Sequence, residues 1–561
     1  MGGTEQNGQE KGGPCKKAFP AAVGVFLLAL AVRLIYLLSM QDSPYHDVTL
    51  LQGTDCYVFY RKAMEIASGD ITGEGVYYQA PLYPYLVALI IKISGDFFQT
   101  AQRLFQFLLG SGVAVMVFYM ARRLKGTAAG LTGGLLVALY GPLIFYEGAF
   151  LRAGVITFLY TLLVFLMLVS RERPGGGKAL AVGAVFGLSL LAKPVIAVML
   201  PVLALWWWDS GKQAKSPNSQ KPGRRAPVRI KTAAGLLAGF VLIMTPLWLR
   251  NYKADADIFS MSRRGALEFV EGNYPGSPPS GWKLTAPVME IVKESDRRLL
   301  PAIINVLRLY RDEPLQLLYK QADKTAAFLY GYEAPNNLNY YVEREYAPLL
   351  RFLPAWPHIL GAGLLGLWFF RRRWREADVL YGFVILYCAA TIAFYILGRF
   401  RLPVVPALCV FCGIGLTSLF DLLQKKRWPA LAAALLVVFL AGLLSWPFQQ
   451  TLLRPVDYYN LARFHAMQRE PAKVHDWLEQ GKADVEKMED RLSPGEYHYY
   501  RGRYLFMGGK PLSSVQSELE TALGKAKDPV LKNDIKNLIK RCERRREGKD
   551  RVYMGMRLFE K

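Results

Sequence analysis

The sequence contains little cysteine, little histidine and relatively few acidic residues. Six cysteines and five histidines occur in 561 residues, and 69 lysines and arginines outnumber 45 acidic residues, giving a net charge of +24. Six cysteines are too few for a disulfide-stapled scaffold. The basic excess would suit nucleic acid, but it lies mostly between apolar runs, so we expect no nucleic-acid partner.

Several motifs of soluble enzymes are also absent. The sequence has no Gly-x-x-x-x-Gly-Lys-Ser/Thr nucleotide loop, no Gly-x-Ser-x-Gly turn and no His-Glu-x-x-His pair. The histidines are scattered, at positions 46, 358, 465, 475 and 498. We therefore predict no metal site and no cofactor, and a divalent metal has no support in the sequence.

Long apolar runs dominate what is present. Hydrophobic residues make up 52% of the chain, which excludes a disordered chain and a soluble enzyme. A membrane-spanning helix needs roughly 20 apolar residues. The sequence therefore predicts an all-α polytopic membrane protein with about eleven spans, at 18–39, 98–121, 127–145, 149–170, 179–191, 194–208, 232–250, 356–370, 379–397, 404–423 and 428–447.

The charged loops predict how the chain is oriented. Eleven alternating spans put the N-terminus and the basic segments 122–125, 171–178, 209–231, 371–375 and 425–427 on one side. Cytoplasmic loops are rich in Lys and Arg, so that side is the cytoplasm. We expect a bacterial inner (plasma) membrane protein, with the loops 40–97 and 251–355 and the tail on the periplasmic side.

Three regions follow from this topology. Residues 1–17 form a cytoplasmic tail, residues 18–447 the membrane domain, and residues 448–561 a helical periplasmic domain. Residues 57–67 and 81–93 of the first loop have helical spacing and are too short to span, so they predict interfacial helices. The tail contains one segment like a tetratricopeptide unit, which would favour a protein partner, but a small helical hairpin domain fits equally well.

Ionisable side chains gather at the predicted outer face. Such residues at the ends of spans usually serve function. Two carboxylates and several cations come from separate segments: Asp55, Glu147, Lys193, Arg250, Arg399 and Arg401. Each also has a structural interpretation: Asp55 could cap the helix that follows it, Glu147 could lie in a solvated turn, and the cations could anchor span ends.

This set of side chains suits one reaction. Cations stabilise the charge that develops on a phosphate leaving group as a sugar departs, and an arginine can hold two phosphate oxygens. A carboxylate takes the proton of an attacking hydroxyl or amine. A donor with a long apolar tail would remain in the bilayer and present its phosphate at the interface.

Seven short motifs carry a family resemblance over roughly residues 18–425. They are the Asp55 segment with 69–70, and then 77–85, 187–194, 248–252, 272–275, 332–337 and 398–403. In this order they resemble the GT-C glycosyltransferases, in the branch of protein O-mannosyltransferases and the lipid A aminoarabinose transferase (glycosyltransferase family 39). The resemblance implies a GT-C fold and an inverting transfer from a polyprenyl-phosphate sugar to a lipid, glycan or protein acceptor.

The resemblance also implies roles for individual residues. Asp55 is the general base and Glu147 the second catalytic acid, while Lys193, Arg250, Arg399 and Arg401 bind the lipid phosphate. Three further residues are expected to contact donor or acceptor: Gln79, Glu333 and Asn336. Cys56 follows Asp55 where protein mannosyltransferases carry a second acidic residue, which argues against protein mannosylation.

Two other functions stay open at this point. A flippase or transporter of lipid-linked sugars would use the same cations only for binding, although its site would be expected near the bilayer midplane. A non-catalytic membrane assembly protein would recruit partners through its tail.

Overall fold

The chain is built from helices throughout, as seen in the computed structural model. The structure describes residues 14–51, 53–171, 175–213, 225–281, 284–447, 453–468, 470–487 and 492–547. Within these ranges, extended pairing is limited to one isolated bridge between Ser280 and Ile396. The prediction of an all-α fold is confirmed.

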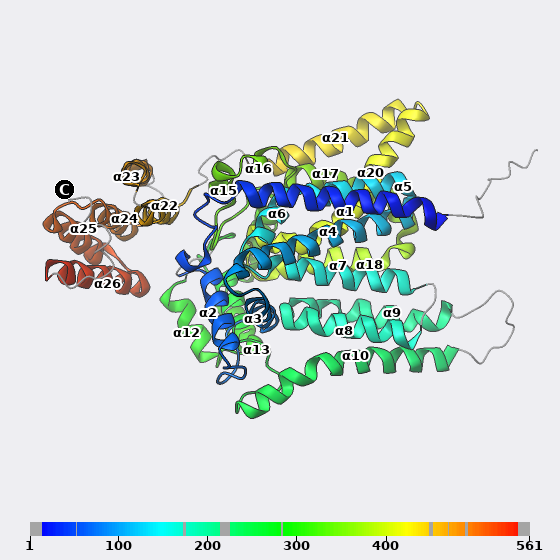
Figure 1. The fold of residues 1–561 in the computed structure, drawn as a ribbon, viewed down its shortest axis with the longest axis horizontal. Coiled ribbons are helices and arrows are strands. Elements are labelled where there is room, and N and C mark those ends of the chain that lie inside the picture. The colour runs from blue at the N-terminus through cyan, green and yellow to red at the C-terminus, as the bar shows by residue number, and fades with distance from the viewer. Residues whose placement is uncertain are drawn as a thin grey trace, which may run out of the picture.

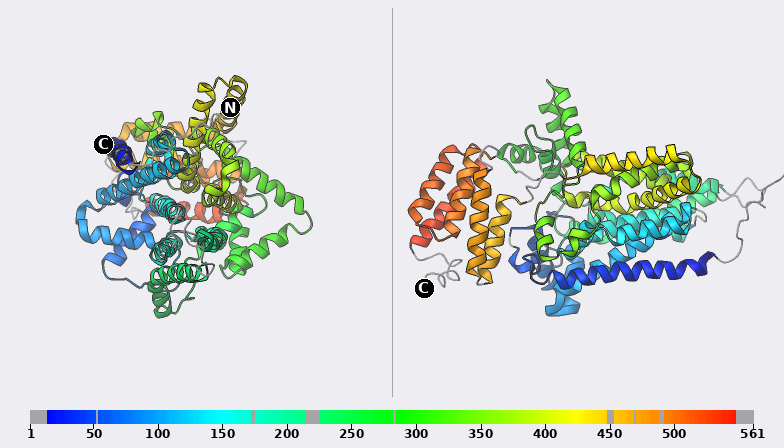
Figure 2. Two further views of the ribbon diagram at one scale, coloured as in Figure 1. Left: turned by 90° about the vertical axis from the view of Figure 1, so that its right-hand side faces the viewer. Right: turned by 90° about the horizontal axis from the view of Figure 1, so that it is seen from above.

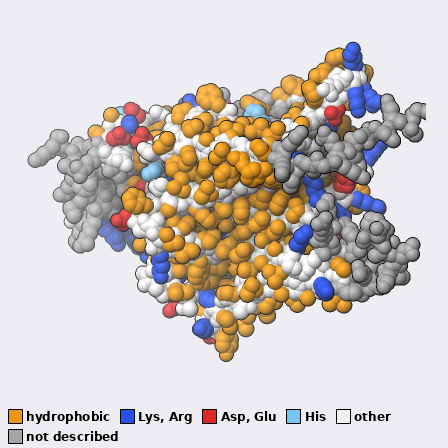
Figure 3. Space-filling view, turned by 45° about the vertical axis from the view of Figure 1, so that its right-hand side comes forward, with side chains coloured by type: hydrophobic (Ala, Val, Ile, Leu, Met, Phe, Trp, Pro, Cys, Tyr) orange, Lys and Arg blue, Asp and Glu red, His pale blue; other side chains and the backbone are white. Residues whose placement is uncertain are grey.

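A bundle of long helices forms the main body of the molecule (Figure 1). Helices that are apolar on most sides are expected for segments surrounded by lipid and by other helices. Its members are α1 (Pro14–Ser39), α4 (Phe98–Lys125), α5 (Thr127–Ala138), α6 (Gly141–Gly148), α7 (Ala153–Ser170), α8 (Gly176–Ala192), η3 (Pro194–Met199), α9 (Leu200–Gln213), α10 (Arg225–Lys253), α17 (Trp356–Phe370), α18 (Asp378–Ala393), α20 (Val405–Gln424) and α21 (Trp428–Ser445). Figure 3 shows a broad apolar surface along the bundle, with Lys and Arg toward its ends.

All eleven predicted spans coincide with helices, but their lengths differ. Seven helices in the described residues are long and apolar enough to cross a membrane, and an eighth span forms if α5 and α6, bent by 48°, are counted together. The predicted spans at 179–191, 194–208 and 379–397 are shorter apolar helices. The chain is therefore an integral membrane protein, while the count of eleven spans stays a prediction.

Shorter helices cover one end of the bundle (Figures 1 and 2). They come from the predicted outer loops. The two short helices expected in the first loop are present as α2 and α3, while their place at the membrane interface stays a prediction. The elements are η1 (Val48–Leu50), α2 (Asp55–Ala67), α3 (Leu82–Ser94), η2 (Gly95–Phe97), α11 (Arg264–Asn273), α12 (Ala286–Glu294), α13 (Leu299–Leu309), α14 (Pro314–Leu329), α15 (Tyr340–Tyr346), α16 (Leu349–Phe352), α19 (Gly398–Arg401) and η6 (Leu402–Val404).

The basic turns lie at the opposite end of the bundle. The C-terminal ends of α4 and α20 and the 3-10 turn η5 (Arg371–Glu376) point away from α2 and α3 (Figure 1). Both ends therefore differ in charge as the topology predicts, but the side of the membrane that each end meets stays a prediction. Residues 1–13 of the N-terminal tail and 214–224 of the loop 209–231 lie outside the described residues.

The part of the tail that the structure describes contains five helices, which lie beyond the end that carries α2 and α3 (Figure 2). Two apolar cores hold them together, one shared by the first three helices and one by the last three. The helices are α22 (Pro455–Met467), α23 (Pro471–Lys487), α24 (Pro494–Met507), α25 (Leu512–Lys525) and α26 (Pro529–Arg546). Helical hairpins are therefore present, while the tetratricopeptide assignment and the domain boundaries remain predictions.

Helices α8 and α10 pack closely because a glycine of each helix faces the backbone of the other. A Cβ added at Gly183 would overlap the carbonyl oxygen of Leu236, and one added at Gly239 would overlap that of Leu180. Small residues that let backbones approach are a general means of packing helices in lipid, where the hydrophobic effect between helices is weak. This contact sets the position of the C-terminal end of α8.

Gly183→Val is expected to lower the free energy of unfolding by about 1–3 kcal/mol, because the new methyl groups force α8 away from α10. Thermal unfolding of the purified protein in detergent measures the effect. Gly24→Val is the matched control, since Gly24 also lies in a bundle helix and a Cβ there meets nothing within 4 Å. Equal changes in melting temperature for the two variants would contradict the close packing.

Candidate active site

Asp55 is the first residue of α2, and its side chain does not cap that helix. The cap is Thr54, whose hydroxyl oxygen accepts a hydrogen bond from the backbone N–H of Tyr57 at 3.4 Å. The interpretation of Asp55 as a helix cap is therefore wrong. Its carboxylate is left to side chains from other parts of the chain.

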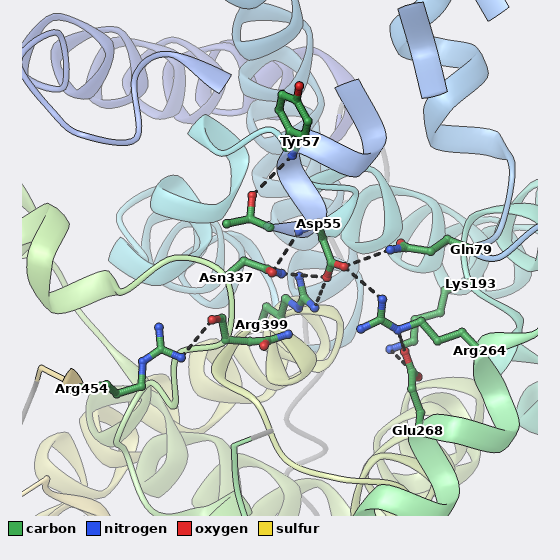
Figure 4. A network of polar contacts seen from close by, with 11 residues as sticks. Asp55, Tyr57, Gln79, Lys193, Arg264, Glu268, Asn337, Arg399 and Arg454 are labelled. Carbon is green, nitrogen blue, oxygen red and sulfur yellow. Dashed lines mark hydrogen bonds and ion pairs between the residues drawn. The ribbon is translucent and has the colours of Figure 1, made fainter. Parts of the chain in front are cut away.

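Four side chains donate hydrogen bonds to the Asp55 carboxylate (Figure 4). Oδ1 accepts from Gln79 Nε2 at 3.0 Å and from Arg264 Nη1 at 3.0 Å. Oδ2 accepts from Asn337 Nδ2 at 2.7 Å and from Arg399 Nη2 at 2.8 Å. The Asp55 backbone N–H also donates to Asn337 Oδ1 at 3.0 Å. Four other chain segments thus converge on one acidic side chain.

A second carboxylate, Glu268, lies one helical turn after Arg264 on α11. Its Oε1 is 3.2 Å from Arg264 Nε, and its Oε2 is 4.0 Å from Lys193 Nζ. The Lys193 ammonium also lies 3.5 Å from the centre of the Phe400 ring. Glu268 therefore links the lysine at the end of α8 to the arginine that binds Asp55.

These groups line two adjoining cavities. The smaller, of about 30 Å³, has six charged lining residues: Asp55, Arg152, Lys193, Arg264, Glu268 and Arg399. The larger, of about 1000 Å³, shares four of them and extends along apolar side chains of η3 and α18: Pro194, Val195, Ala197, Val198, Tyr387, Ala390 and Phe394. Four cations face two carboxylates in the smaller cavity, and this excess of positive charge favours an anionic ligand.

The charges of the site also shift one another's pKa values. Burial raises the pKa of Asp55, but Arg399 and Arg264 outweigh it, so that pKa lies well below its usual range. Burial likewise raises the pKa of Glu268, and Lys193 and Arg264 bring it below its usual value. Burial lowers the pKa of Lys193 to about 7, and Glu268 opposes this while Arg152 and Arg399 add to it. Lys193 is thus the group whose charge changes near neutral pH.

Four of the nine predicted site residues come together. Asp55, Gln79, Lys193 and Arg399 lie in or against the smaller cavity. They come from the start of α2, the segment before α3, the end of α8 and α19, which are far apart in the sequence.

Three predicted residues are buried in structural pairs elsewhere. Glu147 is 1% exposed and lies 2.6 Å from Arg33 Nε, between α6 and α1. Arg401 and Glu333, 1% and 2% exposed, are 2.9 Å apart. The structure does not bring these three side chains to the Asp55 cluster, because each already neutralises a buried partner.

Two more predicted residues also lie apart from the cluster. Arg250 donates to the backbone carbonyls of Thr72 and Gly75 and stacks on Tyr77, so it fixes the first outer loop. Asn336 receives a hydrogen bond on its backbone carbonyl from Arg454. The neighbouring asparagine, at position 337, is the one that reaches Asp55.

Sequence reasoning missed Arg264 and Glu268, and it placed Asn337 in the 332–337 motif without predicting its contact with Asp55. Arg264 and Glu268 are four residues apart on an amphipathic helix of the long outer loop, so their spacing puts both on one helical face. That signal was available, but many surface helices share it. Among the residues that the structure describes, no group of three His, Cys, Asp or Glu side chains is placed to hold a metal ion.

Residues 78–219 match the model of a family described as dolichyl-phosphate-mannose-protein mannosyltransferase. The predicted resemblance to the GT-C glycosyltransferases is confirmed. The matched segment includes Gln79, Arg152 and Lys193, while Asp55 precedes it and Arg264 and Arg399 follow it. A comparison with curated proteins found no match.

Several solved structures of membrane transferases resemble the chain, with low TM-scores and low sequence identity. The apo oligosaccharyltransferase of Archaeoglobus fulgidus has a TM-score of 0.45 and 14% identity, over 79% of this chain and 57% of that one. AglB from Archaeoglobus fulgidus, in complex with an inhibitory peptide and a dolichol-phosphate, has a TM-score of 0.44 and 15% identity, over 81% of this chain and 58% of that one. Apo ArnT from Cupriavidus metallidurans has a TM-score of 0.41 and 17% identity, over 90% of this chain and 78% of that one. The chain thus spans little more than half the length of the archaeal proteins, and similarity at this level does not identify its chemistry.

The excess of cations predicts pH-dependent binding of an anionic ligand, for which a short-chain isoprenyl phosphate is the probe. A lysine with a pKa of about 7 is charged below that pH and neutral above it, so affinity falls as pH rises through 7. Lys193→Arg keeps its charge, and the ratio of wild-type to variant Kd is expected to rise by up to about tenfold per pH unit above the lysine's pKa. Titration of both proteins across this range measures the ratio, which also cancels the ionisation of the phosphate itself. A flat ratio would contradict the assignment of Lys193 to phosphate binding.

Proposed function

We propose that the chain is an integral membrane glycosyltransferase that moves a sugar from a polyprenyl-phosphate donor to a hydroxyl or amine acceptor. The observation that carries this proposal is the buried Asp55 carboxylate, held by two arginines within a cavity that has an excess of cations. The carboxylate would accept the acceptor's proton, and the cations would stabilise the leaving phosphate, which are the two requirements of an inverting transfer.

The donor phosphate would lie among the cations that line both cavities. Arg152 and Lys193 at one wall and Arg264 at the other can surround a phosphate, and arginines can bind two of its oxygens each. The apolar side of the larger cavity, formed by η3 and α18, would receive the first isoprene units. The rest of the lipid would remain in the bilayer, so no nucleotide-binding fold is needed.

Asp55 would serve as the general base. The acceptor's proton passes to a carboxylate oxygen while the acceptor's oxygen or nitrogen attacks the anomeric carbon of the sugar. The bond from that carbon to the phosphate oxygen breaks, and its electron pair remains on the phosphate. The cations stabilise this charge as it develops.

The contacts of Asp55 explain how its carboxylate would become available as a base once the donor binds. With four donors on its oxygens, the carboxylate is a weak base, because Arg264 and Arg399 stabilise its ionised form. A bound phosphate would compete for these guanidinium groups. As they turn toward the phosphate, the pKa of Asp55 rises and an oxygen becomes available to the acceptor.

Glu268 would keep this machinery in place. It contacts both Arg264 and Lys193, and it offsets part of the repulsion among the cations before the donor binds. Its place beside the phosphate site suits a structural charge better than a base, since the two cations stabilise its ionised form. The second catalytic acid predicted at Glu147 is therefore not part of the proposal.

The predicted topology places the reaction on the periplasmic side of the membrane. The site lies at the end of the bundle that carries α2, α3 and α11, which the positive-inside rule assigns to the periplasm of a bacterial inner membrane. The acceptor would be a lipid, a glycan or a protein. The residue Cys56 after Asp55 favours a reaction other than protein mannosylation.

Asp55→Asn is expected to lower kcat by about 10²–10⁴-fold, because the amide accepts no proton while it retains the shape of the side chain. The measurement is release or transfer of labelled sugar from a panel of polyprenyl-phosphate monosaccharides, by protein in lipid. Asp96→Asn, an equal charge change elsewhere in the first outer loop, should retain activity.

Sugar release that is equal in wild type and Asp55→Asn would contradict the role of Asp55. Binding of every donor without release, together with movement of labelled donor across vesicle membranes, would replace the transferase with a flippase.

A further inference from the structure

The first helix of the tail contacts the segment that carries Asn337. Arg454, which precedes α22, donates from Nη1 to the backbone carbonyl of Asn336 at 2.9 Å and to that of Pro335 at 3.3 Å. Figure 4 shows Arg454 on the side of this segment away from Asp55. The tail therefore contacts the peptide units immediately before Asn337.

Asp457 completes the contact on the other side of Asn337. Its Oδ2 accepts a hydrogen bond from Asn339 Nδ2 at 2.9 Å, and its two oxygens bind the Arg454 guanidinium at 2.8 and 3.0 Å. Asp457 is 3% exposed and Asn339 is 0% exposed. Arg454 and Asp457, here called the α22 clamp, thus hold the segment 335–339 at both ends.

The clamp matters because this segment has no regular structure of its own. Residues 332–338 follow α14 and precede α15 without helical hydrogen bonding, so the backbone needs partners from elsewhere. Within the segment, Asn337 both donates to the Asp55 carboxylate and accepts from the Asp55 backbone. A shift of this backbone would carry Asn337 away from Asp55.

The tail is also attached at a second place, which keeps α22 in position. His465 Nε2 lies 3.0 Å from the Tyr346 hydroxyl of α15, with the two rings stacked. The hydroxyl oxygen of Tyr45, from the first loop, accepts a hydrogen bond from the Asn339 backbone N–H at 3.1 Å. The first outer loop, α15 and α22 therefore enclose the segment together.

We propose that Arg454 and Asp457 are positioning residues, which act through Asn337 to orient the Asp55 carboxylate. The tail is then part of the catalytic unit and not an appended domain. This inference rests on the proposed function for its kinetic consequence. The clamp itself is a structural statement that can be tested without any activity.

The kinetic test compares Arg454→Ala with Arg501→Ala. Arg501 is a matched control, because it pairs with Glu518 within the tail and its side chain is 32% exposed, against 31% for Arg454. Arg454→Ala is expected to lower kcat by about tenfold and to leave KM for the donor nearly unchanged, since the phosphate-binding cations stay in place. Arg454→Lys should recover part of the rate, and Arg501→Ala should behave as wild type.

A double-mutant cycle separates positioning from general destabilisation. If Arg454 acts through Asn337, Arg454→Ala lowers kcat no further in an Asn337→Ala background. Full additivity of the two losses would overturn the proposal, as would a loss that appears only in KM for the donor.

Amide hydrogen exchange tests the clamp independently of transfer. In the full-length protein in lipid nanodiscs, peptides covering residues 331–340 are expected to exchange at least about tenfold faster in Arg454→Ala than in Arg501→Ala. Unchanged exchange would overturn the clamp. Faster exchange in a protein whose wild type transfers no sugar would uphold the clamp and contradict the proposed function instead.

Discussion

The architecture at the end of the bundle that carries α2, α3 and α11 depends on keeping one ionised carboxylate away from bulk water. Asp55 is 12% exposed at its side chain, and a carboxylate at that depth is stable only if cations and hydrogen-bond donors replace its hydration. Arg264 and Arg399 supply the charge, and Gln79 and Asn337 supply the remaining donors. Because each donor comes from a different segment, the site exists only when the first loop, the long loop and the bundle are assembled.

Two arrangements of buried charge are to be distinguished near the site. Arg33 with Glu147, and Arg401 with Glu333, are pairs that join elements and line neither cavity of the site. Around Asp55 the cations outnumber the carboxylates and line a cavity. An excess of one sign of charge around a cavity attracts a ligand of the opposite sign, whereas a neutralised ion pair does not.

The tail adds a constraint that the membrane bundle does not provide. The segment 335–339 has no helix or strand to hold its backbone. Arg454, just before α22, donates to the backbone carbonyls of Pro335 and Asn336, and Asp457 of α22 accepts from the Asn339 side chain. The requirement that backbone polar groups be satisfied thus links a region outside the bundle to the residue proposed as base. A position in the tail can thereby influence chemistry in a cavity that it does not line.

Composition and apolar periodicity determined the all-helical membrane fold and the two short helices of the first loop, because these depend on local sequence. Seven short motifs carried the resemblance to GT-C enzymes, and the ionisable residues at span ends together with those motifs pointed to Asp55, Gln79, Lys193 and Arg399. The sequence did not determine the partners: Glu147, Arg401 and Glu333 have the same residue types and similar predicted depths, yet the tertiary structure closes them into pairs. Arg264 and Glu268, and the contact of Asn337 with Asp55, became visible only in the folded chain. The reason is physical, since the role of a charge depends on which opposite charge folding brings within a few ångströms, and those contacts join residues as many as 344 positions apart.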